Sequence, residues 1–217
     1  MKVCTDACVL GAFADVGAGG KLLDIGTGTG LLALMAAQRN PTGLIDAIEI
    51  DNNAFTQAVM NVTESPFAER IQVTHGRIQD FLGEKIYDRI LTNPPFYTNH
   101  LRSPNAAVNR ALHTDELPFP ELLTAVLRLL KAEGQWWVLL PPYEMDILIR
   151  LTLGVGLLPF KRLSLRHHAH KPVFRVITGF SSTKSQPVDE ELSIYESDNR
   201  TYTVDFRALL RDYYLIF

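Results

Sequence analysis

Short apolar runs alternate with segments of helical composition along most of this chain, and this alternation limits the folds available to it. Buried strands are expected over residues 21–25, 44–50, 71–75, 87–92 and 135–140. Helices are expected over residues 31–38, 51–63, 119–131 and 143–154. Strands that alternate with helices of about 10–15 residues predict a mostly parallel, doubly wound sheet of the α/β class.

The last third of the chain has a different pattern. Two β-rich runs, residues 160–168 and 173–180, are separated by a short turn-like stretch, which predicts an antiparallel hairpin at the edge of the sheet. A short strand near Ile194 and a helix over residues 203–214 are expected to follow. The sequence shows no internal repeat, low-complexity tract or linker, so residues 1–217 are predicted to form a single domain.

Composition excludes several classes of protein. The 21 Lys and Arg against 24 Asp and Glu give a net charge of -3, which excludes a strongly basic polyanion binder but allows a local basic patch. The two cysteines, Cys4 and Cys8, are expected to be reduced thiols rather than half of a zinc site. No apolar run approaches the ~18 residues of a membrane helix, and the first residues lack a secretory signal, so a cytoplasmic protein is expected.

Three histidines, His167, His168 and His170, stand near the predicted hairpin turn. Alternation along a strand places His168 and His170 on one face and His167 on the other. Two histidines without a neighbouring acid make a poor metal site, so a surface strand tip is expected and no metal site is predicted.

A glycine-rich loop follows the first expected strand, with the sequence Asp24-Ile25-Gly26-Thr27-Gly28-Thr29-Gly30. Glycines at this place in an α/β sheet allow a tight turn and a close approach to a ligand. The spacing differs from the dinucleotide fingerprint G-x-G-x-x-G, and Asp24 disfavours a phosphate beside it. A nucleoside cofactor with a charge pattern unlike that of NAD is therefore favoured over a plain strand–helix turn.

Glu49 ends the second expected strand, where an acid can accept hydrogen bonds from both ribose hydroxyls of an adenosine. Taken alone, this acid could equally be a solvated strand end. Together with the glycine loop it favours S-adenosylmethionine as the cofactor. The residues predicted to bind it from these two segments are Asp24, Gly26, Thr27, Gly28, Gly30 and Glu49.

The strand at residues 87–92 runs directly into Asn93-Pro94-Pro95-Phe96. Two prolines hold a rigid turn at the carboxyl edge of the sheet, beside the glycine loop. Asn93 Oδ1 and the Pro94 carbonyl can accept the two hydrogens of a planar amine and localise its lone pair toward a methyl group, while Phe96 can stack on the ring. A β-turn with a buried Phe is the alternative. We therefore predict Asn93, Pro94, Pro95 and Phe96 as the catalytic turn.

With these motifs the chain resembles class I S-adenosylmethionine-dependent methyltransferases of the Asn-Pro-Pro-Phe/Tyr group. Within that group it is similar to the enzymes that methylate the N6 amine of the adenosine 3′ to the anticodon of tRNA1(Val). The resemblance spans nearly the whole chain and rests on Met1-Lys2-Val3-x-Thr5-Asp6, Leu23 to Met35, Asp46-Ala47-x-Glu49, Asn93 to Phe96, Arg110-Ala111-x-His113, Arg175 and Tyr213-Tyr214-Leu215.

The resemblance implies a Rossmann-like sheet of seven strands whose sixth and seventh strands form a hairpin. It also implies that Thr5 and Asp6 lie near the methionine end of the cofactor. Where many relatives carry an Asp that holds the adenine, this chain has Arg77, and Asp80 is the nearest candidate. Leu112 replaces an arginine common in the loop of relatives. Relatives usually carry a few dozen residues before the Met-Lys-Val segment, so an RNA-contacting or lid segment is expected to be missing.

A cluster of cations predicts where RNA docks. The hairpin region carries five Lys and Arg, three His and no acid over residues 161–175, whereas five acids lie between Asp189 and Asp198. The predicted RNA-binding residues are Arg102, Arg110, Lys161, Arg162, Arg166, Lys171 and Arg175. Edge protection by charge is the alternative explanation of the hairpin cations. The expected partner is tRNA, with no membrane contact and a monomeric enzyme.

Three other functions remain open at this point. A guanine-N2 RNA methyltransferase shares Asn-Pro-Pro-Phe, although such enzymes often follow it with His, where Tyr97 stands here. A protein glutamine methyltransferase usually has Asn-Pro-Pro-Tyr and an additional helical domain. A nucleoside-binding Rossmann protein without enzymatic activity would have no use for Asn93.

Overall fold

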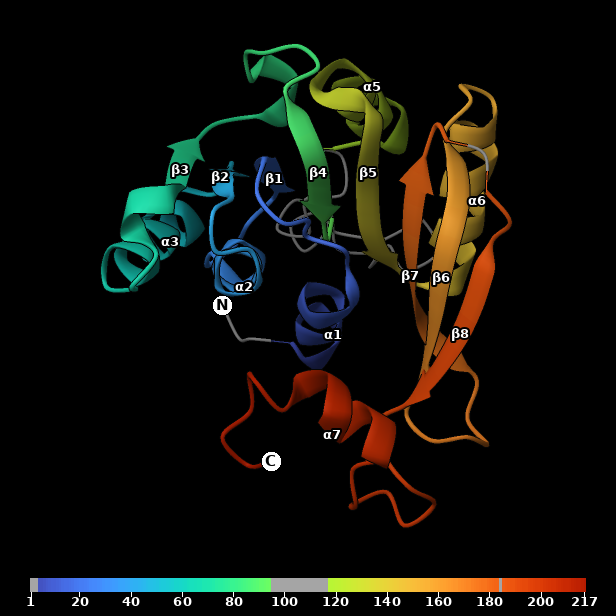
Figure 1. Ribbon diagram of the computed structural model, residues 1–217. Coiled ribbons are helices and arrows are strands. Elements are labelled where there is room, and N and C mark those ends of the chain that lie inside the picture. Colours follow the sequence, from blue (N-terminus) through green and yellow to red (C-terminus); the bar gives the residue numbers. More distant parts are fainter. Residues whose placement is uncertain (1–3, 95–116, 184) are drawn as a thin grey trace, which may run out of the picture.

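The apolar runs of the sequence form one twisted sheet in a computed structural model, which describes residues 4–94, 117–183 and 185–217 (Figure 1). Its strands are β1 (Lys21–Ile25), β2 (Leu44–Glu49), β3 (Ile71–His75), β4 (Tyr87–Thr92), β5 (Leu130–Leu140), β6 (Leu158–Arg166), β7 (Val173–Ser181) and β8 (Val188–Ser193). The helices are α1 (Thr5–Phe13), α2 (Leu31–Arg39), α3 (Asn52–Thr63), α5 (Phe119–Leu129), α6 (Pro142–Leu153) and α7 (Val204–Leu210), with 3₁₀ turns η1 (Ala68–Arg70) and η2 (Ile78–Asp80).

The strand order is β3-β2-β1-β4-β5-β7-β6-β8. The first five strands of the sequence pair in parallel, and β7 lies antiparallel between β5 and β6. This confirms the Rossmann-like α/β class and the antiparallel hairpin. The expected number of seven strands is wrong, because β8 adds an eighth strand in parallel to β6.

The same strand corrects the predicted position of the hairpin. The β6–β7 hairpin does not form the edge of the sheet, since β8 covers β6 from Lys161 to Arg166. Acids in β8 lie beside cations in β6, and opposite charges on neighbouring strands favour pairing. The short strand expected near Ile194 is thus a longer, acidic edge strand that ends at Ser193.

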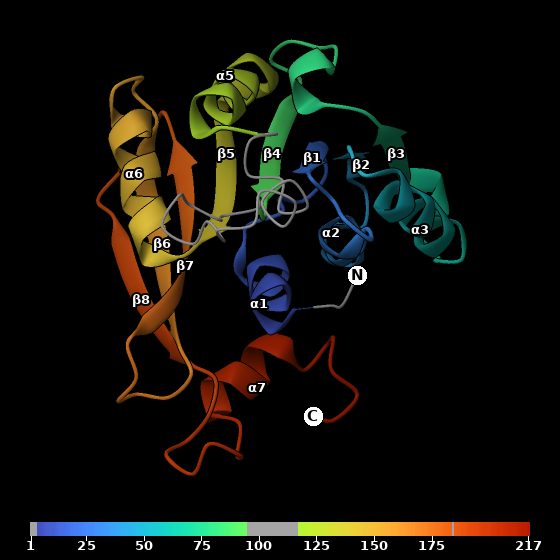
Figure 2. The same cartoon turned by 180° about the vertical axis from the view of Figure 1, so that it is seen from behind.

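Helices cover both faces of the sheet (Figures 1 and 2). One core packs α1, α2 and α7 against one face, and a second core packs α5 and α6 against the other. Trp136 and Trp137, neighbours in β5, are both buried and belong to different cores, because successive side chains of a strand point to opposite faces. Within the described ranges, no helix is both long and apolar enough to cross a membrane.

Helix α1 was not expected from the sequence. Six of its nine residues, Ala7 to Ala12, are buried in succession, so the helix has no polar stripe and no helical periodicity to detect. Its N-cap residue Cys4 and the buried Cys8 form no disulfide among the described residues. The helix fills the lower end of the sheet in Figure 1, next to the ends of the parallel strands.

Asn40, after α2, joins the loops that lead into β1 and β2. Its side chain is fully buried, and its Oδ1 accepts from the backbone N–H groups of Gly19 (2.7 Å) and Gly43 (2.8 Å). Its Nδ2 donates to the carbonyls of Val16 (2.8 Å) and Gly19 (2.9 Å). Four hydrogen bonds from one amide fix the entry points of the two strands that carry the glycine loop and Glu49.

We expect Asn40→Ala to lower the free energy of unfolding by about 2–4 kcal/mol, because it leaves several buried backbone groups without partners. Urea unfolding followed by circular dichroism measures the change. The matched control is Asn53→Ala, an exposed residue in the first turn of α3, which should change it by less than about 0.5 kcal/mol. Equal effects of the two substitutions would contradict the role given to Asn40.

Candidate active site

The register of three parallel strands brings the predicted residues to one edge of the sheet. Ile25 at the end of β1 pairs with Ile48 in β2 and with Thr92 in β4. The residues that follow, Gly26, Glu49 and Asn93, therefore lie side by side at strand spacings of about 5 Å. This is the carboxyl edge of the parallel strands, where ligands bind in open α/β sheets.

The glycine loop turns over the end of β1 in a left-handed conformation. Gly26 has φ +70° and Gly28 has φ +60°, a region that residues with a Cβ rarely adopt. A Cβ at Gly26 would meet nothing within 4 Å, so the space above it is open. The backbone N–H groups of Gly26 (2.9 Å) and Thr27 (3.0 Å) both donate to the carbonyl of Ile48, which ties the loop to β2.

The Glu49 carboxylate is held in place by backbone donors. Its Oε2 accepts from Gly28 N (2.7 Å), and its Oε1 accepts from the N–H groups of Ile50 and Asp51, both at 2.9 Å. The residue is only 8% exposed. Three donors fix the direction of the carboxylate and leave further lone pairs for a ligand's hydroxyl groups.

Asp24 is buried beneath the loop. Its Oδ2 accepts from the Thr27 hydroxyl (2.5 Å) and from Ala33 N (3.2 Å). Its Oδ1 is buried and has no hydrogen-bond partner among the described residues. Burial, with a smaller contribution from the negative Glu49, raises the pKa of Asp24 to about 7. The site is therefore built to receive a positive charge or a donor at this oxygen.

Asn93 presents a second acceptor at this edge of the sheet. It follows β4 directly and is half-buried, and its Oδ1 has no partner among the residues that the structure describes. Thr92 before it is locked, since its Oγ1 accepts from the Trp136 indole at 3.0 Å. Pro94 is buried, whereas Pro95 and Phe96 lie outside the described residues. The structure thus offers a desolvated carboxamide oxygen beside Gly26.

Thr5 and Asp6 lie in the first turn of α1. The Asp6 carboxylate forms an ion pair with Arg175 of β7, with an Oδ2 to Nε distance of 2.9 Å. A residue predicted to bind cofactor thus pairs with one predicted to bind RNA. Tyr214 shares hydrogen bonds with the side chains of Thr5 and Cys8. In the sequence Tyr214 stands out only as part of the resemblance, because only the fold brings residue 214 next to residue 5.

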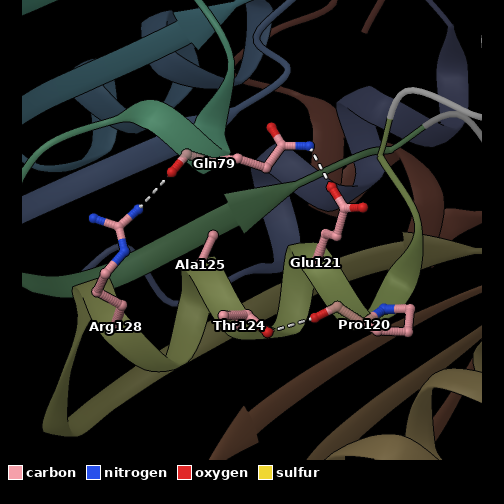
Figure 3. Close-up of a pocket in the computed structure, with 6 residues that line it drawn as sticks. All are labelled: Gln79, Pro120, Glu121, Thr124, Ala125 and Arg128. Carbon is pink, nitrogen blue, oxygen red and sulfur yellow. Dashed lines mark hydrogen bonds between the residues drawn. The ribbon is translucent and has the colours of Figure 1, made fainter.

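Asp80 lies in the turn that follows β3, and both Asp80 and Arg77 are exposed. Helix α5 clamps this turn: Arg128 donates to the carbonyls of Phe81 (2.6 Å), Gly83 (3.0 Å) and Ile78 (3.3 Å), and to the Gln79 carbonyl at 3.5 Å (Figure 3). Gln79 donates to Glu121 at 2.8 Å. A cavity of about 240 Å³ between the turn and α5 is not lined by Asn93 or Glu49. Its lining residues are Gln79, Pro120, Glu121, Thr124, Ala125 and Arg128 (Figure 3). The contact of Asp80 with adenine stays a prediction.

Three of the five predicted RNA-binding cations that the structure describes pair with acids, namely Lys161, Arg166 and Arg175. Lys161 pairs with Glu190 at 3.0 Å, and Arg166 pairs with Glu191 at 3.2 Å. Lys171 is exposed, and Arg162 is half-buried. Arg102 and Arg110 lie outside the described residues. The strands of the hairpin therefore present less net positive charge than their sequence indicates, because β8 supplies acids from elsewhere in the chain.

The site fits S-adenosylmethionine on its own chemistry. The molecule carries a ribose diol, an ammonium group and a sulfonium, which match an oriented carboxylate, an unpaired carboxylate oxygen and a loop with open space above Gly26. Glu49 would hold the ribose, and Asp24 would face the positive charge. A pyrophosphate, in contrast, would meet two carboxylates.

We expect Asp24→Asn to stabilise the protein without cofactor while weakening cofactor binding. Folding raises the pKa of Asp24 from 3.8 to about 7. At pH 8 the ionised Asp24 carboxylate therefore destabilises the folded state, by at most roughly 4 kcal/mol for three pKa units. The destabilisation decreases as the pH falls from about 7 toward 4, because the folded state then binds the proton first.

Urea unfolding at pH 8 and pH 5 measures this difference, and calorimetry with S-adenosylhomocysteine measures binding. The gain in stability over the unsubstituted protein should be larger at pH 8. An Asp24→Asn protein that is less stable at pH 8, or that binds the ligand with unchanged affinity, would contradict the role of Asp24.

Comparisons with known proteins agree with this geometry. Residues 7–141 match the family described as "Methyltransferase small domain". The chain is 47% identical to a tRNA1(Val) (adenine(37)-N6)-methyltransferase from Dyadobacter fermentans, over 100% of this chain and 92% of the relative. It is 38% identical to a protein of the same name from Pseudoalteromonas translucida, over 99% of this chain and 92% of the relative.

Solved structures show the same fold. A predicted O-methyltransferase from Agrobacterium tumefaciens superposes with a TM-score of 0.73 at 15% identity over 95% of both chains. Geranyl diphosphate C-methyltransferase from Streptomyces coelicolor superposes with a TM-score of 0.58 at 10% identity, over 82% of this chain and 79% of that one. The chain therefore belongs to the methyltransferase small domain family and is an S-adenosylmethionine-dependent methyltransferase.

Proposed function

We propose that the protein methylates the exocyclic N6 amine of an adenosine in tRNA, namely the adenosine 3′ to the anticodon in a tRNA1(Val)-type substrate. The observation that carries this proposal is the buried Oδ1 of Asn93, which has no partner among the described residues and lies beside the open space over Gly26. The names of the relatives at 47% and 38% identity over nearly all of this chain support the choice of nucleotide. We place the reaction in the cytoplasm. We assign it to a monomer, since one chain supplies Gly26, Glu49 and Asn93.

Methyl transfer to the N6 amine requires hydrogen-bond acceptors and no general base. S-adenosylmethionine supplies a methyl group on a positively charged sulfur. The N6 lone pair of adenine is delocalised into the ring, which makes the amine a poor nucleophile. Two acceptors, Asn93 Oδ1 and the Pro94 carbonyl, bind both N–H groups and turn the lone pair out of the ring plane toward the methyl group. The methylated amine is acidic enough to lose its proton to water.

Phe96 would hold the ring of the target base by stacking, and we retain this as a proposal for a residue outside the described part of the chain. The two prolines fix the turn, so little reorganisation is needed when the base enters. The target adenosine must be turned out of its stack to reach this edge, as in other enzymes that act on bases.

The direct test is mass spectrometry of nucleosides from total tRNA incubated with the protein and S-adenosylmethionine. N6-methyladenosine should appear in tRNA prepared from cells that lack this modification. N2-methylguanosine instead, or methylation of glutamine in a release-factor domain offered in parallel, would replace the proposed substrate by one of the alternatives.

Asn93→Ala should slow methyl transfer by about 10²–10³-fold, because it removes one oriented acceptor from a preorganised site. The affinity for S-adenosylhomocysteine should stay nearly unchanged, since Asn93 is assigned to the amine and not to the cofactor. Single-turnover kinetics and calorimetry measure the two quantities. The matched control is Asn53→Ala, which lies exposed on α3. Turnover close to that of the unsubstituted protein would remove Asn93 from the mechanism.

A further inference from the structure

The end of the β6–β7 hairpin projects past the catalytic edge of the sheet. Leu140, the last residue of β5, pairs with Val176 of β7, so Val173 to Arg175 extend beyond β5. Three extended residues span about 10 Å, and the turn over residues 167–172 lies beyond them. We call residues 166–175 the hairpin arm, which reaches the lower end of the sheet in Figure 1.

The arm lies at the same end of the sheet as Asn93. Asn93 follows β4, and β7 is two strands away in the order β4-β5-β7. Two strand spacings correspond to about 10 Å. An RNA strand whose base lies at Asn93 would bring its neighbouring nucleotides within reach of the arm.

Most guanidinium charge on the arm is already compensated within the protein. Arg166 pairs with Glu191 at 3.2 Å, and Arg175 pairs with Asp6 at 2.9 Å. The ion pair of Arg175 also anchors the arm to the first turn of α1. Lys171 remains exposed in the turn. Little uncompensated positive charge is therefore left on the arginines of the arm, and its exposed surface also carries aromatic rings.

His167 and Phe174 form a flat stack on the arm. Their ring centroids are 4.2 Å apart, and their planes differ by only 8°. Phe174 is half-buried, whereas His167 is exposed. The backbone at His167 is fixed, because its carbonyl accepts from Tyr195 N at 2.8 Å and the carbonyl of Arg166 accepts from Ile194 N at 3.0 Å. The protein thus presents an exposed ring with one face supported.

We propose that the hairpin arm binds single-stranded RNA next to the target adenosine, with one unstacked nucleobase extending the His167–Phe174 stack. Single-stranded RNA loops are recognised in this way, through splayed bases that stack on Phe, Tyr, Trp or His rings. The exposed Lys171 in the same turn suits a neighbouring phosphate. This inference rests on the proposed function, since it takes tRNA as the substrate.

The experiment uses the full chain, S-adenosylhomocysteine, and an anticodon stem-loop RNA with 2-aminopurine placed in turn at each loop position beside the target. His167→Ala should weaken RNA binding by about tenfold, the usual effect of losing one stacked base, and abolish quenching of the probe at one position. His167→Tyr should keep both. The affinity for S-adenosylhomocysteine and the melting temperature should be the same in all variants.

The matched control is His170→Ala, an exposed residue of the same turn whose ring lies 6.2 Å from that of His168 at 70°. It should change RNA affinity by less than about twofold, because it supports no stacked ring. Unchanged binding by His167→Ala, or an equal loss in His167→Tyr, would overturn the proposal. If one of these results is found while the unsubstituted protein methylates tRNA, only the RNA-binding role of the arm is contradicted, and the proposed function still holds.

Discussion

Parallel pairing of β4, β1 and β2 is the constraint on which the site depends. The three strands end at matched positions, so Asn93, Gly26 and Glu49 meet although 67 residues separate the first from the second. The chain leaves β1 through a left-handed glycine loop, and the loop is tied to β2 by the Ile48 carbonyl and by Glu49. A shift of one residue in either pairing would turn these side chains to the opposite face and separate the acceptors.

At the candidate site, two buried oxygens have no hydrogen-bond partner among the described residues, and they mark where this protein gives up stability for function. Asp24 Oδ1 lies under the glycine loop, and Asn93 Oδ1 lies beside it. An unpaired buried acceptor is unfavourable by about 1–3 kcal/mol, and such groups persist where a ligand completes them. The raised pKa of Asp24 reflects the same unfavourable environment, since burial and the negative charge of Glu49 both disfavour the ionised carboxylate. The side chains of Thr92 and Glu49 at the same edge are, in contrast, hydrogen-bonded within the protein.

The charges of the C-terminal third are arranged differently from their order in the sequence. Cations of β6 and β7 find acids on β8 and α1, which are remote in sequence. The hairpin is consequently held on both sides, and its projecting end is rigid enough to present an aromatic stack. Substrate recognition at this arm would then depend on ring surfaces and shape as much as on charge.

The sequence was sufficient to predict the alternating strands and the positions of the glycine loop, Glu49 and Asn93, because local composition and the parallel-sheet rule place such residues at one edge. It did not show α1, since a helix buried all round has no periodicity. It placed the hairpin at the sheet edge and counted its cations as free, because nothing local tells that β8 returns to pair with β6. Only packing joins Asp6 to Arg175 and Tyr214 to Thr5, since contacts between residues so far apart in sequence depend on the tertiary path of the whole chain.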